Sequence, residues 1–216
     1  MKKRTLLVIC LAALCLGAAP AMADLFGFSY SNPRTTFDGA SLFTAQDAAT
    51  TTGDVYRNIA PAGTASFDSG SWGMGLEDLL VQMTLSSITG STADGSGTFT
   101  LTDVDGDTIS GNLAGQWVLF VGSPIFSGSL SNVTYTSVMD NTFDGHSGSG
   151  ASMIFSAPQP WNGTLVEITT RGTWFQSGSY NVQGGSIDAT VVPVPGAVLL
   201  GMLGLSVAGI RLRKSA

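Results

Sequence analysis

Three aspartates spaced two residues apart are the first candidates for chemistry in this chain. Asp103, Asp105 and Asp107 imitate the start of a calcium loop, in which carboxylates at alternate positions share a cation. A calcium loop between helices also needs glycine at its sixth position and glutamate at its twelfth, and Thr108 and Ala114 occupy these places. The flanking residues alternate as in strands, which favours an Asp-Gly hairpin turn. A partly hydrated Ca²⁺ site at the three carboxylates is the functional alternative.

The segment GHSGSG at residues 145–150 imitates the serine elbow of hydrolases. That elbow requires glycine at its fifth position, which Ser149 occupies here. His146 is the single histidine of the chain, and a histidine next to Ser147 in sequence rarely reaches it as a general base. We therefore expect a Gly/Ser loop with a solvated histidine.

Other kinds of catalytic centre lack the residue types that they need. One histidine, with both cysteines near the N-terminus, cannot build the usual zinc ligand sets. Glycoside hydrolysis needs two facing carboxylates, for which Glu77, Asp78, Glu167 and Asp188 are candidates. Fifteen acidic residues make such a pair easy to draw, so residue type alone does not support one. We predict a protein that is not an enzyme and has no cofactor, the Ca²⁺ alternative aside.

The elements that must position these residues are predicted to be β-strands. Apolar Val81, Met83 and Leu85 alternate with polar residues, as do Phe99 and Leu101, which is typical of half-buried strands. Many short strands joined by turns predict an all-β fold, an antiparallel β-sandwich or barrel. Further strands, nearly all bounded by Gly, Ser, Asn or Asp, are expected at residues 27–30, 64–68, 108–113, 117–121, 125–138, 151–155, 165–170, 173–180 and 187–192.

Two segments depart from this alternation. Residues 40–52 are expected to form either a short helix or a loop, and residues 75–80 a single helical turn. Helix formers such as Lys, Glu and Gln are few between residues 24 and 191. We therefore expect no long helix in this part of the chain.

The nineteen aromatic residues all lie between residues 26 and 180. Aromatic side chains bury large areas, so we expect them to form the core of a sheet that is otherwise rich in small residues. The alternative is an exposed aromatic surface that stacks on sugar rings, at Trp72, Trp117, Trp161 or Trp174.

The charge of residues 24–191, which have the length of one domain, limits the possible partners. This part carries three arginines, no lysine and all fifteen acidic residues, which gives a net charge of −12. Nucleic-acid binding rests on Lys and Arg that displace counterions from phosphates. The composition therefore excludes nucleic acid as a partner.

The first 23 residues are predicted to form a signal peptide. A basic KKR sequence precedes an apolar run at residues 6–16, and Ala21 and Ala23 form a small-x-small cleavage site. Cleavage by signal peptidase after Ala23 removes both cysteines, so the mature domain has no thiol. An uncleaved signal anchor is the alternative, although the apolar run is short for a membrane span.

Residues 192–216 are predicted to form a membrane anchor with a single transmembrane helix. A turn signal, an apolar run at residues 197–210 and a basic cluster follow one another, and the basic end should stay on the cytoplasmic side. As a helix the run spans about 21 Å, which is short for a hydrocarbon core of about 30 Å. The turn signal is Pro193, Val194, Pro195 and Gly196, and the basic cluster is Arg211, Arg213 and Lys214.

This C-terminal segment resembles the PEP-CTERM sorting signal, in which two prolines precede a glycine-punctuated apolar helix and a basic tail. Val194 stands where the family has glutamate between the prolines, as in a divergent subclass of the signal. The resemblance implies an exported Gram-negative bacterial protein that a membrane-embedded exosortase processes. It further implies a location at the cell surface or in the extracellular (biofilm) matrix, and it implies no activity.

Two classes of function remain for the domain at residues 24–191. The class that we favour is a surface- or matrix-associated structural or binding protein without catalysis, with extracellular polysaccharide as a partner. The alternative is a secreted carbohydrate-binding module or a carbohydrate-active enzyme of β-sandwich type. An exposed tryptophan beside a groove with two carboxylates would favour the alternative, and buried tryptophans would favour the first class.

Overall fold

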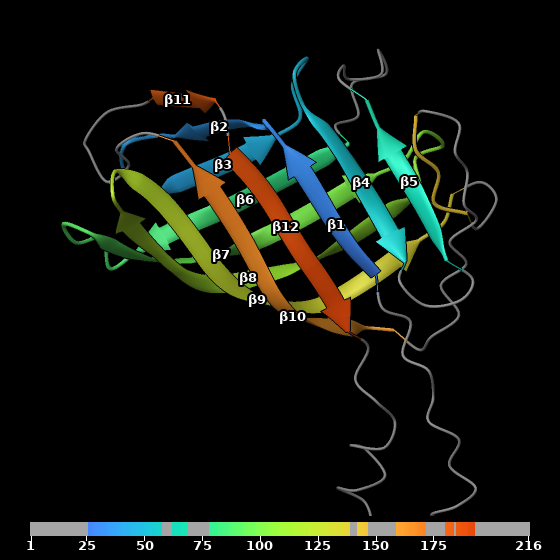
Figure 1. Ribbon diagram of the computed structural model, residues 1–216. Helices are drawn as coiled ribbons and strands as arrows, with labels where there is room; N and C mark the ends of the chain where they lie inside the picture. Colours follow the sequence, from blue (N-terminus) through green and yellow to red (C-terminus); the bar gives the residue numbers. More distant parts are fainter. Residues whose placement is uncertain are drawn as a thin grey trace, which may run out of the picture. The chain divides into compact units, whose positions relative to one another are not determined.

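Strands make up the regular structure of the part of the chain that the structure describes. The computed structural model describes residues 26–57, 62–68, 78–138, 142–146, 159–171, 180–183 and 185–192, and these ranges contain no helix. The prediction of an all-β fold is therefore confirmed for them (Figure 1). The strands are β1 (Phe26–Ser31), β2 (Arg34–Phe37), β3 (Leu42–Gln46), β4 (Thr52–Arg57), β5 (Gly63–Phe67), β6 (Leu79–Ser86), β7 (Thr92–Thr102), β8 (Thr108–Phe120), β9 (Ser123–Thr136), β10 (Trp161–Thr170), β11 (Tyr180–Gln183) and β12 (Gly185–Val192).

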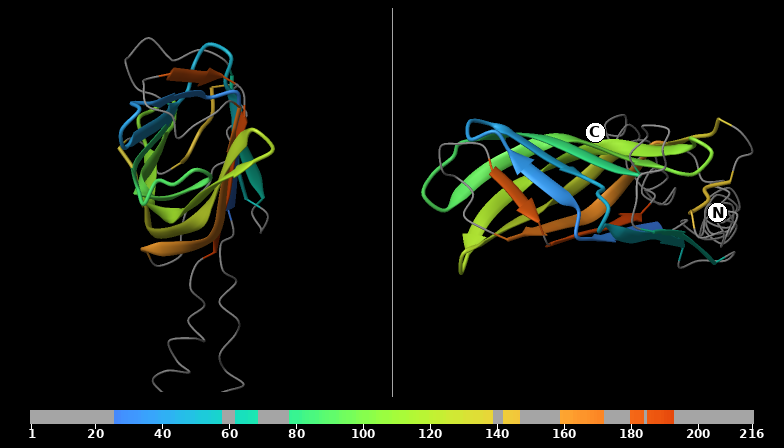
Figure 2. Two further views of the ribbon diagram at one scale, coloured as in Figure 1. Left: turned by 90° about the vertical axis from the view of Figure 1, so that its left-hand side faces the viewer. Right: turned by 90° about the horizontal axis from the view of Figure 1, so that it is seen from above.

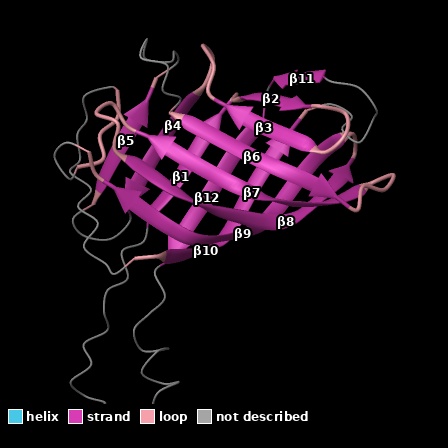
Figure 3. Ribbon diagram, turned by 180° about the vertical axis from the view of Figure 1, so that it is seen from behind, coloured by secondary structure: helices cyan, strands magenta, loops and turns pink. Residues whose placement is uncertain are grey.

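All twelve strands belong to one antiparallel sheet. Its order is β11-β2-β3-β6-β7-β8-β9-β10-β12-β1-β4-β5, so β1 and β12, from the two ends of the domain, pair with each other inside the sheet. The sheet folds over on itself: β10, β12, β1 and β4 form a layer that crosses the layer of β6 to β9 (Figures 1 and 3). The two layers are seen edge-on in Figure 2. We call the layer that contains β1 the front layer and the other the back layer.

Aromatic side chains from both layers meet between them. The ring of Phe28 in β1 stacks on that of Phe99 in β7, with 5.3 Å between the ring centroids. The ring centroid of Trp117 in β8 lies 5.0 Å from that of Phe43 in β3 and 5.3 Å from that of Phe126 in β9. All five side chains are buried. Burial of such large apolar areas is the main favourable contribution to folding in a sheet with so many small residues.

The two described tryptophans belong to this core. Trp117 and Trp161 are 0% and 1% exposed, and the Trp161 ring meets Phe26 edge-on with 5.8 Å between centroids. The prediction of core packing is confirmed for these two residues, and an exposed aromatic surface is wrong for them. Trp72 and Trp174 lie outside the described residues.

Residues 42–46 form strand β3, so the expectation of a short helix or a loop over residues 40–52 is wrong for them, whereas residues 47–51 form a loop. Phe43 and Ala45 of β3 point into the core and alternate with half-buried neighbours. β3 pairs with β2 through a turn in which Asp38 Oδ1 accepts hydrogen bonds from the amides of the second, third and fourth following residues at 2.8–2.9 Å. These hydrogen bonds from one aspartate side chain stabilise the short turn between the two strands.

Other expected elements changed in extent. Residues 79 and 80 begin β6 rather than a helical turn, and residues 75–77 lie outside the described residues. The strands expected at 108–113 and 117–121 are one strand, β8. Most of the strands expected at 151–155 and 173–180 lies outside the described residues.

The hairpin between β8 and β9 has an unusual residue in its turn. Phe120 and Ser123 are the last pair, so Val121 and Gly122 form a two-residue loop. Their φ angles are 47° and 79°, as a type I′ turn requires at both positions. A β-branched residue in the left-handed region is strained, and Val121 is 88% exposed without compensating burial.

We expect Val121→Asn to raise the free energy of unfolding by about 1 kcal/mol, because asparagine tolerates the left-handed conformation that valine resists. In a domain of this size that corresponds to a rise in Tm of about 2–4 °C, measurable by circular dichroism. Val118→Asn is the matched control, since Val118 is also exposed but lies within β8. An equal or larger Tm for the control variant would contradict the prediction.

Candidate functional site

A shallow groove lies on the outward face of β1, β4 and β5, in the front layer. Apolar side chains of these strands point inward, and the alternate positions carry short polar side chains. The groove has a volume of about 320 Å³, and Gly53 and Phe67 contribute to its lining. The other residues that line it, which we call the outer groove, are Ser29, Ser31, Thr52, Asp54, Ser66 and Asp68.

The strand register places hydroxyls directly opposite carboxylates in the outer groove. Asp54 in β4 pairs with Ser29 in β1 on one side and with Ser66 in β5 on the other. Ser31 pairs with Thr52 in the next outward row. Neither Asp54 nor Asp68 has an ion-pair partner among the described residues, which include all three arginines of the domain. The groove therefore carries two negatively charged side chains without a described ion pair, set among hydroxyl groups.

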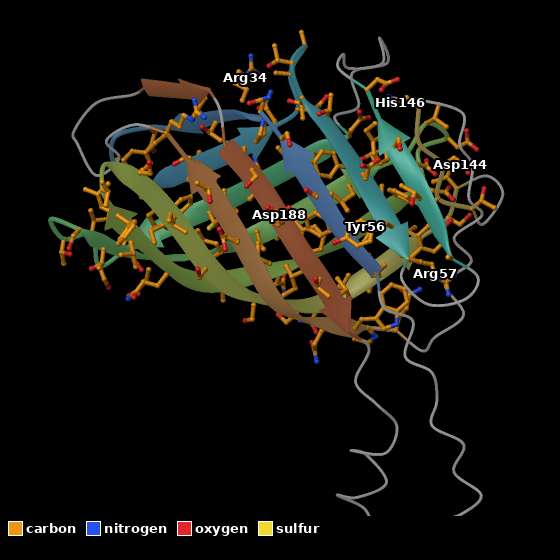
Figure 4. All side chains as sticks on the ribbon, viewed as in Figure 1. Arg34, Tyr56, Arg57, Asp144, His146 and Asp188 are labelled. Atoms are coloured by element: carbon orange, nitrogen blue, oxygen red, sulfur yellow. The ribbon has the colours of Figure 1, made fainter. Side chains whose placement is uncertain are left out.

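Tyr56 extends this surface along β4. It lies opposite Gly27 in β1, and a Cβ atom at Gly27 would come within 2.6 Å of the Tyr56 ring and its hydroxyl oxygen. The ring therefore lies over the backbone of β1, in space that only a glycine leaves open. Tyr56 is half-buried, and Figure 4 shows it on the same layer as Asp188.

Two of the carboxylates considered for glycoside hydrolysis come together. Glu167 in β10 lies directly opposite Asp188 in β12, and both are exposed. Glu167 Oε1 accepts a hydrogen bond from the Thr169 hydroxyl at 3.3 Å. Like charges directly opposite each other destabilise a sheet slightly. The groove described above does not include this pair, and Glu77 lies outside the described residues.

The three aspartates of the calcium candidate lie in the turn between β7 and β8, so the predicted hairpin turn is confirmed. The Gly106 amide donates to the Asp103 carbonyl at 3.3 Å, and Gly106 has a φ of 92°. Aspartate at the first and glycine at the fourth position are typical of this kind of turn. The Asp103 and Asp107 side chains are buried, and Asp105 is exposed.

The carboxylate of Asp103 organises the turn. Its Oδ1 accepts the amides of Asp105 at 3.0 Å and Asp107 at 2.7 Å, and its Oδ2 accepts the amide of Asp144 at 3.1 Å. Burial raises the pKa of Asp103 to about 6, although these amides act in the opposite direction. The same carboxylate thus joins the turn to the segment at residues 142–146.

Asp107 also uses its oxygens within the protein. Its Oδ2 accepts the Tyr135 hydroxyl, and its Oδ1 accepts the Val138 amide, both at 2.5 Å. Burial, followed by the hydrogen bond to Asp107, raises the pKa of Tyr135 well above its usual value. No group of three or more acidic, histidine or cysteine side chains arranged for a metal ion occurs among the described residues. Hydrogen bonding therefore explains Asp103 and Asp107 without an ion.

His146 is not solvated, which corrects the expectation from the sequence. Its side chain is 4% exposed, and its Nε2 lies 3.2 Å from Oδ1 of Asp78, whose side chain is 7% exposed. The histidine ring also packs edge-on against Phe67, with 5.6 Å between centroids. Gly145 approaches the Ser66 backbone so closely that a Cβ would lie 2.1 Å from the carbonyl oxygen. The segment with Asp144 and His146 therefore lies against β5 (Figure 4).

Further buried titratable groups lie near this pair. Asp47 follows β3, its amide donates to the carbonyl of Leu79, the residue next to Asp78, and neither of its carboxylate oxygens has a hydrogen-bond partner among the described residues. Burial raises the pKa of Asp47, against the opposing effect of nearby amides. Burial, with the Asp47 charge nearby, raises the pKa of Asp78 to about 7. Burial lowers the pKa of His146, and the charge of Asp68 acts in the opposite direction.

The residues predicted for export and sorting lie outside the described part of the chain. They are Ala21, Ala23, Pro193, Val194, Pro195, Gly196, Arg211, Arg213 and Lys214. Within the described part, no helix is long and apolar enough to cross a membrane. The predictions for both ends of the chain therefore stay predictions.

The described residues define an antiparallel β-domain with a polar, acidic groove on one outward face. No family model, curated protein or solved structure matches the chain. The groove was not predicted from the sequence, where its only signal is the alternation of serines with the aromatics of β1.

Proposed function

We propose that this chain is an exported protein of the cell surface or extracellular matrix, whose β-domain has a structural or binding role without catalysis. The single structural observation that favours binding is the outer groove, which exposes hydroxyls and two carboxylates on paired strands. Rigid strands hold polar groups in fixed positions, and binding then orders few additional side chains.

The sorting pathway is part of the same proposal. Residues 1–23 act as a signal peptide for signal peptidase, and residues 192–216 anchor the chain in the membrane until an exosortase-like enzyme processes it. The support is the order of turn signal, apolar run and basic cluster at the C-terminus. The acidic domain, with a net charge of −12, then lies outside the cytoplasm.

Fractionation of the native host tests this proposal. The intact mass of the protein is measured separately in membranes and in culture medium. We expect a species that starts at Asp24, ends between Pro193 and Ala197 and is released from the membrane. A Pro193→Ala/Pro195→Ala variant should stay in the membrane fraction, because the helix can then extend toward the domain. A native species that keeps Arg211 to Ala216 and stays in the membrane would contradict sorting.

A carbohydrate-active enzyme is the second candidate, and the facing carboxylates of Glu167 and Asp188 favour it. Two carboxylates that flank a glycosidic bond are the minimum equipment for its hydrolysis. The burial of Trp117 and Trp161 counts against this candidate, because neither ring is exposed to stack on a sugar. Release of reducing sugar by the wild type and its loss in Glu167→Gln would support the enzyme.

A further inference from the structure

We propose that the outer groove binds a polysaccharide that carries free amino groups, with Asp54 and Asp68 as partners of its ammonium groups. This inference deepens the proposed function and rests on it only for access to extracellular polysaccharide. Four hydroxyl residues and two carboxylates line the groove. Sugar hydroxyls and ammonium groups offer the complementary donors and acceptors.

The charge of the groove selects a cationic ligand. Asp54 and Asp68 are exposed and have no described ion-pair partner, and the domain around them has a net charge of −12. Of the three arginines, Arg57 is buried at the end of β4, and Arg34 and Arg171 lie outside the groove. An anionic polymer would be repelled by this field, whereas an amino sugar would be attracted to it.

The residue types favour a sugar over a protein. Centres of protein interfaces are depleted in charge and enriched in aromatic and apolar residues, but Ser29, Ser31, Thr52 and Ser66 supply hydroxyls here. Successive outward positions on a strand lie about 7 Å apart. Asp54 and Thr52 are successive outward residues of β4, so each presents polar groups together with its cross-strand partners at positions about 7 Å apart along the strand.

Tyr56 adds an aromatic ring to the same outward face of β4. It is the next outward residue of β4 after Asp54, and its ring lies over Gly27 rather than projecting from the sheet. A ring in this orientation can stack against a pyranose, and the face of a tyrosine ring attracts an ammonium group by about 0.5–1 kcal/mol at an exposed site. Tyr56 and the two carboxylates thus favour the same class of ligand.

The proposal is tested with soluble glucosamine oligomers and the full-length chain in mild detergent, by calorimetry at low and moderate salt. We expect the glucosamine oligomers to bind more tightly than N-acetylated oligomers of the same length. Asp54→Asn/Asp68→Asn should weaken binding about three- to tenfold, as expected for two exposed charge pairs. Tyr56→Leu should weaken it about threefold through loss of the ring face, and Tyr56→Phe should not.

Asp94→Asn is the matched control, since Asp94 is an exposed carboxylate on β7 in the back layer. An equal loss of affinity in this variant would overturn the proposal, because general charge attraction would then explain binding. Equal binding of acetylated oligomers, or tighter binding of polylysine with the same dependence on Asp54 and Asp68, would overturn it as well. Circular dichroism shows whether each variant folds. None of these outcomes changes the intact masses that test export.

Discussion

Replacing Asp103 by alanine should lower the free energy of unfolding by about 2–4 kcal/mol, because three amides that donate hydrogen bonds to its carboxylate would lose their acceptor. Those amides belong to Asp105 and Asp107 in the turn and to Asp144 in the neighbouring segment. Asp103 is 3% exposed, so water replaces the carboxylate poorly. In a domain of this size the loss corresponds to a fall in Tm of about 5–10 °C.

Asp103→Asn separates hydrogen bonding from charge. The side-chain oxygen of asparagine can still accept hydrogen bonds from the amides of Asp105 and Asp107. Its NH₂ group, however, would face the Asp144 amide, and two donors cannot form a hydrogen bond. We expect a loss of stability between those of the wild type and the alanine variant. Asp94→Asn serves as the control for removal of an exposed carboxylate from β7. An Asp103→Ala variant that melts with the wild type would contradict the structural role of this carboxylate.

A calcium titration of the same proteins tests the remaining alternative for this turn. Asp103 and Asp107 accept hydrogen bonds at both oxygens, and a calcium ion would have to displace these donors. We expect millimolar Ca²⁺ to leave the Tm unchanged. A rise in Tm for the wild type that Asp103→Asn abolishes would instead support the calcium site.

The strands of the back layer could be predicted because their alternation is long and regular. Leu79, Val81, Met83 and Leu85 are buried, and the residues between them are half-buried or exposed. The strands β2 and β4 could not be predicted in this way, because Thr35 and Arg57 take inward positions that an apolar residue would have marked. In β3, the exposed Leu42 precedes the buried Phe43 and hides the alternation. The fold of the single sheet could not be predicted either, since β1 pairs with β12 near the other end of the domain.

The candidate sites show the same division between local and distant information. The hairpin turn at Asp103 could be predicted from its own residues, because aspartate and glycine specify such turns. Its hydrogen bond to Asp144 joins residues 41 positions apart, which no local pattern contains. The burial of His146 depends on its contact with Asp78 and on the approach of Gly145 to β5. A Gly/Ser-rich context suggested a solvent-exposed loop for the same residues.

The stability of the domain should depend on pH through the buried carboxyl group of Asp78. The pKa of Asp78 is about 7 in the folded protein, against an ordinary value of 3.8. A carboxyl group whose pKa is raised by folding contributes its full stabilisation below its ordinary pKa, here 3.8. This contribution is lost as the pH rises toward and through the pKa of the folded protein, here about 7. Burial lowers the pKa of His146. This residue therefore stabilises the fold at pH values above the ordinary pKa of histidine. Between pH 6.5 and 8 the Asp78 effect therefore dominates.

We expect the free energy of unfolding of the wild type to fall by about 1 kcal/mol between pH 6.5 and 8. In Asp78→Asn this fall should largely disappear, because the amide does not ionise and still accepts a hydrogen bond from the His146 ring. Urea unfolding at several pH values measures the change. A residual slope below pH 6.5 should persist in the variant, since Asp103 has a pKa of about 6 and that of Asp47 is also raised.

The neighbours of Asp78 make this test specific. Among the described residues, the titratable groups that interact with Asp78 are Asp47 at the end of β3, Tyr30 in β1 and His146. Asp68 acts in turn on His146. Ionised Asp47 and ionised Asp78 repel each other in a buried site, which favours a neutral Asp78 beside a neutral His146 at mildly acidic pH. His146→Gln should therefore steepen the decline between pH 5 and 6.5, because the opposing histidine contribution is gone. An unchanged decline in Asp78→Asn would place the titrating group elsewhere and contradict the buried pair as its origin.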